Sequence, residues 1–227
     1  TLSQKQKWAR VQVSDNPDFS NILWDSGEDS TISSVDCPLR IETLPRTRYW
    51  WRVTVCGDTG DIASSEPAWF ETGKQEEPWQ GKWITTGQDS HIHPLFRRNF
   101  TLTEEPQCAR IYATGLGLYE LSVNGQKAGD EYLAPGCTAY DKCLQYQTYD
   151  VTAMLHKGQN TLGAMMGNGW AIGRFGLGGY AGNYETGDLG TPCHLFSDQF
   201  LFLLECRLGG KPGMTVEPVL LLSLIHI

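Results

Sequence analysis

The chain has 227 residues, with 26 acidic against 18 basic side chains and a formal net charge of −8 at pH 7. This length suits one large or two small domains, and an acidic chain without a basic stripe is a poor partner for nucleic acid. The many aromatic residues and 25 glycines favour an all-β protein, with aromatic cores and glycines at turns.

Short strands separated by turn signals are expected over residues 1–73. The expected strands are residues 8–13, 22–24, 31–35, 49–55 and 68–72. In the fourth of these, Trp51, Val53 and Val55 alternate with other residues and would share one face. This spacing predicts a β-sandwich of the fibronectin type III or immunoglobulin-like kind.

A charged segment, residues 74–78, ends on a proline and is expected to be an extended, exposed linker. A second β-domain is expected over residues 79–209, and Asn124-Gly125 predicts a tight hairpin within it. A single helical turn is expected at residues 150–155, capped by Asp150 or Thr152. The expected strands are residues 95–102, 109–114, 118–123, 145–151, 162–166 and 200–208.

The seven cysteines are scattered, with no Cys-x-x-Cys pair, which argues against a zinc site. Their odd number favours free thiols in a reducing compartment, so a cytoplasmic location is favoured and secretion stays open as the alternative. The apolar end of the chain, Leu220 to Ile227, is too short to span a bilayer, and no membrane partner is expected.

Several motifs resemble the N-terminal part of bacterial α-L-rhamnosidases, which are multidomain glycoside hydrolases. The stretch from Ala109 to Trp170 resembles the N-terminal β-sandwich of that family, and Trp79-Gln80-Gly81-Lys82-Trp83-Ile84 resembles its opening. Leu23-Trp24-Asp25-Ser26-Gly27 and Arg48-Tyr49-Trp50-Trp51-Arg52-Val53 resemble the fibronectin-like module at the front of these enzymes. The resemblance implies two tandem β-sandwiches, the second larger, jelly-roll-like and of the carbohydrate-binding type.

The resemblance also implies that the first module is incomplete. Residues 8–13 resemble its third strand, so this copy is expected to lack its first strands. The family hydrolyses terminal α-L-rhamnose by inversion, which uses two carboxyl groups with a water between them. In the family both carboxylates belong to a downstream helical barrel, so we expect no catalytic residue in this chain.

The sequence is therefore compatible with two functions. The first is a non-catalytic N-terminal portion of an α-L-rhamnosidase, with the downstream catalytic domain and rhamnose-containing glycans as partners. The second is a free-standing carbohydrate-binding module with no enzymatic partner domain. The sequence shows no group of side chains that would form a catalytic site within these residues.

A glycine-rich loop with aromatic residues follows Gly167 and is the expected sugar-binding segment, because aromatic faces stack on sugar rings while polar groups bind the hydroxyls. Relatives of this domain include calcium-dependent rhamnose-binding modules. By that resemblance Asp141 is the candidate calcium ligand. The candidate carbohydrate-binding residues are Tyr140, Asp141, Asn168, Trp170 and Arg174.

Structural roles remain open for each of these candidates. Trp170 could fill a core or a domain interface, Asp141 could cap a turn, and Arg174 could pair with a carboxylate of a neighbouring domain. Two departures from the family pattern, Cys137 and Ala171 in place of aromatic residues, weaken the case for a binding cleft. The acidic pair Asp130-Glu131 is interpreted as solvated loop residues.

Residues 210–227 are expected to be a tail without function. Its last six residues, Leu-Ser-Leu-Ile-His-Ile, can be back-translated into a transposase adapter used in library preparation. The alternative is a buried strand, and the codons at this position decide between the two.

Overall fold

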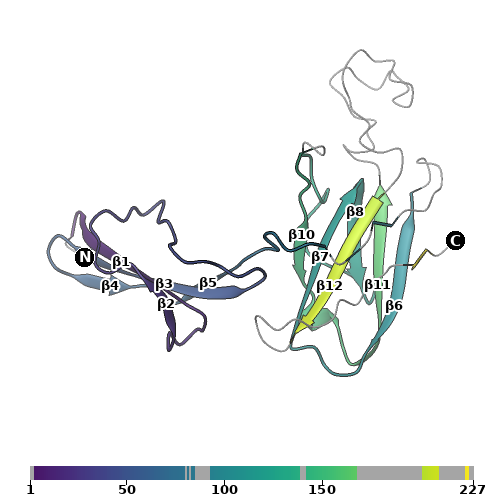
Figure 1. Ribbon diagram of the computed structural model, residues 1–227, viewed down its shortest axis with the longest axis horizontal. Helices are drawn as coiled ribbons and strands as arrows, with labels where there is room; N and C mark the ends of the chain where they lie inside the picture. The colour runs from purple at the N-terminus through teal and green to yellow at the C-terminus, as the bar shows by residue number, and fades with distance from the viewer. Residues whose placement is uncertain are drawn as a thin grey trace, which may run out of the picture. The chain divides into compact units, whose positions relative to one another are not determined.

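The computed structural model describes residues 3–79, 81, 83–84, 93–138 and 142–167, together with the backbone of 201–209 and 223–224 (Figure 1). The chain divides into two compact units, residues 1–78 and 79–227. Apart from one short 3₁₀ turn, the regular elements of the described residues are strands, so the expected all-β class is confirmed. In this described part, no helix is long and apolar enough to cross a membrane.

The first unit contains one antiparallel sheet. Its strands run in the order β2-β1-β3-β4, and β5 pairs with the other half of β3. The strand expected at residues 31–35 is wrong, because this segment forms no ladder and lies in the long connection between β2 and β3. The three-residue β4 was not expected from the sequence. The strands are β1 (Gln6–Ser14), β2 (Ile22–Asp25), β3 (Arg48–Gly57), β4 (Ile62–Ser64) and β5 (Ala68–Glu71).

The register of β1 and β3 sorts their side chains into two unlike faces. Val11 lies opposite Val53 and Val13 opposite Trp51, so the face predicted for Trp51, Val53 and Val55 is confirmed. We call this the apolar face, and its members are Ala9, Val11, Val13, Trp24, Trp51, Val53, Val55 and Phe70.

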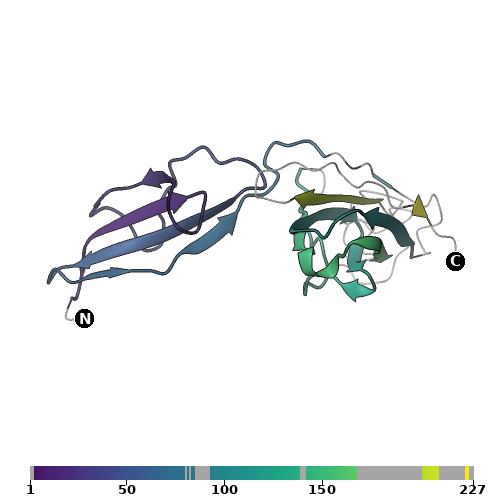
Figure 2. The same ribbon diagram turned by 90° about the horizontal axis from the view of Figure 1, so that it is seen from below.

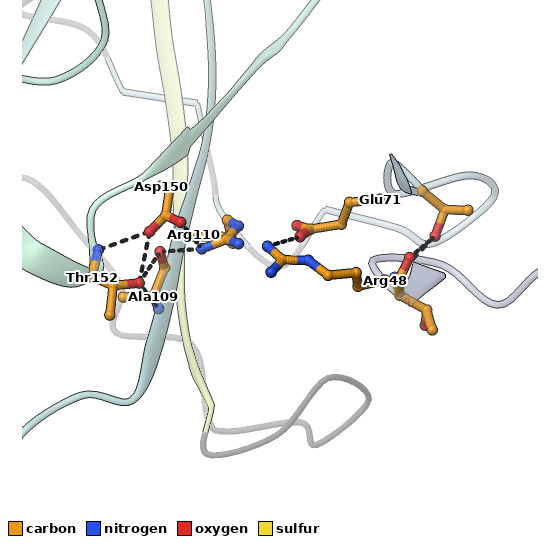
Figure 3. Close-up of polar contacts among 8 residues, drawn as sticks. Arg48, Glu71, Ala109, Arg110, Asp150 and Thr152 are labelled. Atoms are coloured by element: carbon orange, nitrogen blue, oxygen red, sulfur yellow. Dashed lines mark hydrogen bonds and ion pairs between the residues drawn. The ribbon is translucent and has the colours of Figure 1, made fainter. Parts of the chain in front are cut away.

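The opposite face of this sheet is charged and aromatic. Arg10 forms an ion pair with Asp25, and the Arg52 guanidinium lies 4.3 Å from the centre of the Phe19 ring. Arg48 lies 4.0 Å from the centre of the Trp69 ring and also pairs with Glu71 at 3.1 Å (Figure 3). This alternation is typical of an antiparallel sheet with one face toward a core and one toward water.

In the charged segment after Gly73, Gln75, Glu76 and Pro78 are exposed, but Lys74 and Glu77 pack against the first unit. Lys74 is only 2% exposed, and its carbonyl accepts a hydrogen bond from the Glu77 amide at 3.0 Å. The Glu77 carboxylate forms an ion pair with Arg46, whose side chain is 12% exposed. A turn and a bidentate pair therefore hold this segment against the first unit.

The second unit is a two-sheet sandwich. One sheet has the order β10-β7-β12 and the other β13-β6-β11-β8-β9, and Figure 2 shows them as two layers. Alternate residues of both sheets, among them Ile111, Leu121, Val123 and Leu162, are at most 2% exposed and form one core. The strands are β6 (Leu95–Leu102), β7 (Cys108–Leu116), β8 (Leu118–Val123), β9 (Gln126–Lys127), β10 (Gln147–Asp150), β11 (Gly158–Gly167), β12 (Leu201–Gly209) and β13 (Ser223–Leu224).

The predicted hairpin is confirmed: Asn124 and Gly125 have φ of 51° and 81°, the left-handed pair that joins β8 to β9. The helical turn is a 3₁₀ turn, η1 (Thr152–Met154), and Val151 at its N-cap position makes no side-chain bond. The capping bond comes from Asp150, one of the two expected residues, whose carboxylate accepts bonds from the Thr152 amide and hydroxyl and pairs with Arg110 at 2.8 Å (Figure 3).

Candidate functional site

The candidate residues of the sequence lie outside the described part of the chain: Tyr140, Asp141, Asn168, Trp170 and Arg174. The calcium prediction at Asp141 falls there too. Gly167, which directly precedes Asn168 in the sequence, is described, and it lines a cleft on the second unit. This cleft is the candidate site for which the structure gives geometry.

The cleft has a volume of about 520 Å³ and opens on the outer side of the sheet that contains β8 and β11. Its walls combine apolar, aromatic and charged side chains. The lining residues are His93, Leu118, Tyr119, Glu120, Lys127, Glu131, Tyr132, Leu133, Met165, Met166 and Gly167. A mixed lining of this kind, with few polar groups among apolar ones, is typical of small-molecule sites.

A returning loop builds one wall of the cleft. After the hairpin the chain runs back along β8, where the Ala128 amide bonds to the Leu121 carbonyl at 2.8 Å and the Tyr119 amide to the Ala134 carbonyl at 2.9 Å. Leu133 has a φ of 59°, and its carbonyl accepts the Gly136 amide at 2.9 Å. The tight turn leaves Leu133 58% exposed at the cleft.

Tyr132 is the most prominent side chain of the cleft, with 84% of its surface exposed. The Lys127 ammonium lies 4.3 Å from the centre of its ring and 3.0 Å from a carboxylate oxygen of Glu120. The lysine therefore makes a cation–π contact with the ring while the carboxylate balances its charge. The ring is an exposed aromatic surface at the cleft.

Behind the cleft, two buried tyrosines form a short hydrogen-bond chain. The Tyr149 hydroxyl donates to the Tyr119 hydroxyl at 3.4 Å, and Tyr119 donates to Gln147 Oε1 at 2.6 Å. Burial raises the pKa of Tyr119 far above its ordinary value, and the bond with Tyr149 and the Glu131 charge add to this. Burial also raises the pKa of Tyr149. Both phenols therefore stay neutral and act as structural donors.

Glu131 lies over a glycine. A Cβ placed on Gly129, whose φ is 75°, would come within 2.2 Å of a Glu131 carboxylate oxygen and 2.6 Å of the Tyr149 ring. Gly129 is therefore needed both for its left-handed backbone and for the space it leaves. The glycine thus leaves room for this carboxylate and for the Tyr149 ring.

The cleft presents an exposed ring, aliphatic side chains and carboxylates close together. A ring face can stack on the apolar face of a sugar, while carboxylates and His93 can bind hydroxyls. Within the described residues, no group of three or more His, Cys, Asp or Glu side chains is placed to hold a metal ion.

Sequence reasoning missed Tyr132 and Lys127, whereas Glu131 is an exposed loop residue as expected. The signal was present in the sequence Asp130-Glu131-Tyr132-Leu133, where an aromatic and an aliphatic residue follow two acids in a loop. An aromatic and an aliphatic residue side by side in an exposed loop indicate a binding surface.

Two domain families match this sequence. Residues 1–76 match the Rha78A-like N-terminal immunoglobulin domain, and residues 104–198 match the α-L-rhamnosidase N-terminal domain. The two matches follow one another along the chain and fall in the first and the second unit.

The whole proteins with related sequences described next are each named α-L-rhamnosidase. An α-L-rhamnosidase of Formosa agariphila is 33% identical in an alignment of 175 residues, and the match covers 71% of this chain and 18% of the relative. One of Streptomyces avermitilis is 52% identical over 98 residues, covering 43% of this chain and 10% of the relative. The chain thus spans about a fifth or less of the length of these curated relatives.

Solved structures agree with these sequence matches. The α-L-rhamnosidase of "Dictyoglumus thermophilum" superposes with a TM-score of 0.71 at 27% identity, over 90% of this chain and 23% of that structure. The enzyme of Aspergillus terreus gives the same TM-score and identity over 91% of this chain and 24% of that structure.

Proposed function

We propose that this chain, which joins the two domain families found at the N-terminus of α-L-rhamnosidases, is a non-catalytic N-terminal portion of such an enzyme. The observation that carries the proposal is the tandem match, residues 1–76 followed by 104–198, in a chain that spans about a fifth of its relatives. Catalysis then belongs to the remaining part of the enzyme, and this portion supports it.

The most direct test is hydrolysis. The purified chain is incubated with the chromogenic substrate p-nitrophenyl α-L-rhamnopyranoside, and released nitrophenol is followed. We expect no turnover above that of a heat-denatured sample. Turnover that persists in independent, chromatographically pure preparations would overturn the proposal.

A chimera tests the supporting role. The portion of the Formosa agariphila relative that matches 71% of this chain is replaced by this chain, and the truncated relative without that portion is the control. We expect the chimera to hydrolyse the rhamnoside and to melt at a higher temperature than the truncated control. Equal melting temperatures would contradict a supporting role, because a packed N-terminal portion must stabilise its neighbour.

A second role, recognition of rhamnose-containing glycans, is favoured by the cleft at Tyr132. An 84% exposed ring in cation–π contact with Lys127 is the kind of platform on which a sugar ring stacks. The candidates after Gly167 and the Asp141 calcium site belong to this same proposal. In the alternative, the chain is a free-standing carbohydrate-binding module.

Calorimetric titration with L-rhamnose tests this second role, first with added calcium and then with a chelator. Tyr132→Ala tests the cleft and Trp170→Ala tests the sequence-predicted residue, and Tyr146→Phe, in a ring that packs against Trp79 and Tyr112 and does not line the cleft, is the control. Saturable heat that is lost in an alanine variant supports recognition by the substituted residue. Absence of heat from a folded sample would leave the supporting role alone.

A further inference from the structure

The turn between β8 and β9 consists of Asn124 and Gly125, and an asparagine followed by glycine is chemically labile. The Gly125 backbone nitrogen attacks Asn124 Cγ, so that a new C–N bond forms and the Cγ–Nδ2 bond breaks. Nδ2 then leaves as ammonia with the Gly125 amide proton. Water opens the resulting cyclic imide to aspartate or isoaspartate. Glycine favours the attack because it has no side chain to hinder it.

The fold holds the Asn124 side chain in three hydrogen bonds. Its Oδ1 accepts from the Thr161 amide at 2.8 Å, and its Nδ2 donates to the Met154 carbonyl and to Asn160 Oδ1, each at 2.8 Å. The Asn124 amide also donates to the Thr161 carbonyl at 2.8 Å. The side-chain oxygen therefore takes the place of the backbone carbonyl that an antiparallel pair would use there. These bonds fix the turn to η1 and to the start of β11.

These three bonds oppose the first step of the reaction. For the attack, Asn124 Cγ has to turn toward the Gly125 nitrogen, and this rotation breaks the side-chain bonds to Met154, Asn160 and Thr161 together. The reaction is therefore confined to molecules in which the turn has opened. Its rate in the native chain then follows the population of that open form.

Asn160, the partner of Asn124, cannot adapt to a changed neighbour. Its side chain is 1% exposed, and its nitrogen donates to the carbonyls of His156 at 2.7 Å and of Gly158 at 3.1 Å. Its oxygen accepts from the His156 amide at 3.1 Å. A half turn of this amide group would set donor against donor and acceptor against acceptor. Asn160 therefore presents only an acceptor to Asn124.

A carboxylate at position 124 does not fit this arrangement. It has no proton to donate, so one of its oxygens would face the Met154 carbonyl and Asn160 Oδ1 without a hydrogen atom between them. Among the three partners of Asn124 Nδ2, only the exposed His156 ring, at 3.5 Å, can change from acceptor to donor. Isoaspartate would also lengthen the backbone of a two-residue turn by one carbon atom.

We propose that Asn124 is a deamidation site that the fold keeps unreactive until the β8–β9 turn opens, and that its product cannot re-form the original hydrogen bonds. Deamidation at this position thus records opening of the second unit and weakens the unit irreversibly. Water is the co-reactant and ammonia the leaving group, so the step needs no enzyme. This chemistry is independent of the rhamnosidase assignment.

Peptide mapping by mass spectrometry tests the proposal on the full chain. The native chain and the chain unfolded in guanidinium chloride are held at the same mildly alkaline pH and temperature, and amide loss at Asn124 is followed over time. We expect loss at least tenfold slower in the native chain. Asn168, the other asparagine that precedes a glycine, is the reference for the unfolded chain and should react there at a rate similar to that of Asn124. Equal rates at Asn124 in the native and unfolded chains would overturn the proposal.

The link to opening is tested below the unfolding midpoint. Small additions of guanidinium chloride should raise the rate of amide loss in step with hydrogen exchange of the Thr161 amide, because the same opening releases both groups. A rate of loss that stays constant while this amide exchanges faster would contradict reaction through the open form.

Asn124→Asp imitates one product, and Asn99→Asp is its matched control with the same gain of charge. Asn99 Oδ1 accepts a bond from the Thr161 hydroxyl at 2.9 Å, which a carboxylate can also accept. Denaturant unfolding should show a folded-to-unfolded ratio of the second unit at least tenfold lower in Asn124→Asp and within twofold of the wild type in Asn99→Asp. Failure of Asn124→Asp alone to fold supports the proposal, whereas wild-type stability of Asn124→Asp would overturn the claim that the product no longer fits.

Discussion

Apolar residues alternate with other residues along the strands of both units, but they are buried to different extents. In the second unit, alternation along β8 and β11 puts Leu121, Val123 and Leu162 at 2% exposure or less between two sheets. In the first unit, alternation along β3 is as clear, yet Trp51, Val53 and Val55 stay half-buried. Alternation therefore decides which face of a sheet is apolar, but burial depends on a second layer.

The largest expected effect lies in the closed core of the second unit. Leu121→Ala removes a side chain that is 1% exposed, and such a change costs about 3 kcal/mol of unfolding free energy. Val53→Ala in the first unit, which removes less and from a half-buried site, should cost about 1 kcal/mol. Urea unfolding followed by two-dimensional NMR separates the units, and equal losses would contradict the contrast.

Loss of buried hydrogen bonds in the second unit should lower its unfolding free energy nearly as much. The Asn160 side chain, 1% exposed, donates to the carbonyls of His156 and Gly158 and accepts from Asn124. Asn160→Ala leaves these groups unpaired and should destabilise the unit by about 2 kcal/mol. Gln159→Ala, at an exposed neighbouring position, should change the same urea midpoint hardly at all.

The charged face of the first unit should respond to pH. The hydrogen bond from Arg10 lowers the pKa of Asp25, as do bonds from Gly27 and Gln12. Its stabilisation is therefore complete above the unfolded pKa, near 4, and is lost as the pH falls through the lower folded pKa. Asp25→Asn should cost about 1 kcal/mol at pH 7.

This loss should shrink as the pH falls below 4, because the Asp25 carboxyl of the unfolded chain takes up a proton there while that of the folded chain resists it. Thermal melts of both proteins between pH 2 and pH 7 measure the difference. A difference that stays constant over that range would contradict an ionic contribution, since the neutral amide and the carboxylate would then behave alike.

The smallest stability effect is expected at the cleft. Tyr132 is 84% exposed, so Tyr132→Ala should alter the unfolding free energy by less than about 0.5 kcal/mol. Thermal melting checks this value alongside the sugar titration. A larger loss would mean that the ring has a packing role and would weaken its assignment as a binding platform.

Much of the fold was predictable from local patterns. Residues 95–102 and 118–123 were placed as strands with the observed bounds, because their alternation is regular and turn residues flank them. The strand expected at 31–35 was wrong, since Thr31 and Ile32 have high strand propensity but no partner strand lies beside them among the described residues. Strand formation at this place depends on pairing, which a single sequence does not reveal.

The candidate site was less predictable than the fold. Its geometry depends on the return of the chain along β8, where Tyr119 meets Ala134. Lys127 reaches Glu120 through the register of the β8–β9 hairpin, and it meets Tyr132 on the returning chain. Such contacts follow from a loop conformation, and the spacing of residue types along the sequence carries little information about it.

The turn at Lys74 has a practical consequence for proteolysis and for truncation. Trypsin needs an accessible, extended lysine, so it should cut slowly after Lys74 despite the charged sequence around it. A truncation that ends at Gly73 would remove the Glu77 carboxylate from Arg46, whereas one that ends at Pro78 keeps it. The shorter product should therefore be degraded faster, which makes residue 78 the better end point for studying the first unit alone.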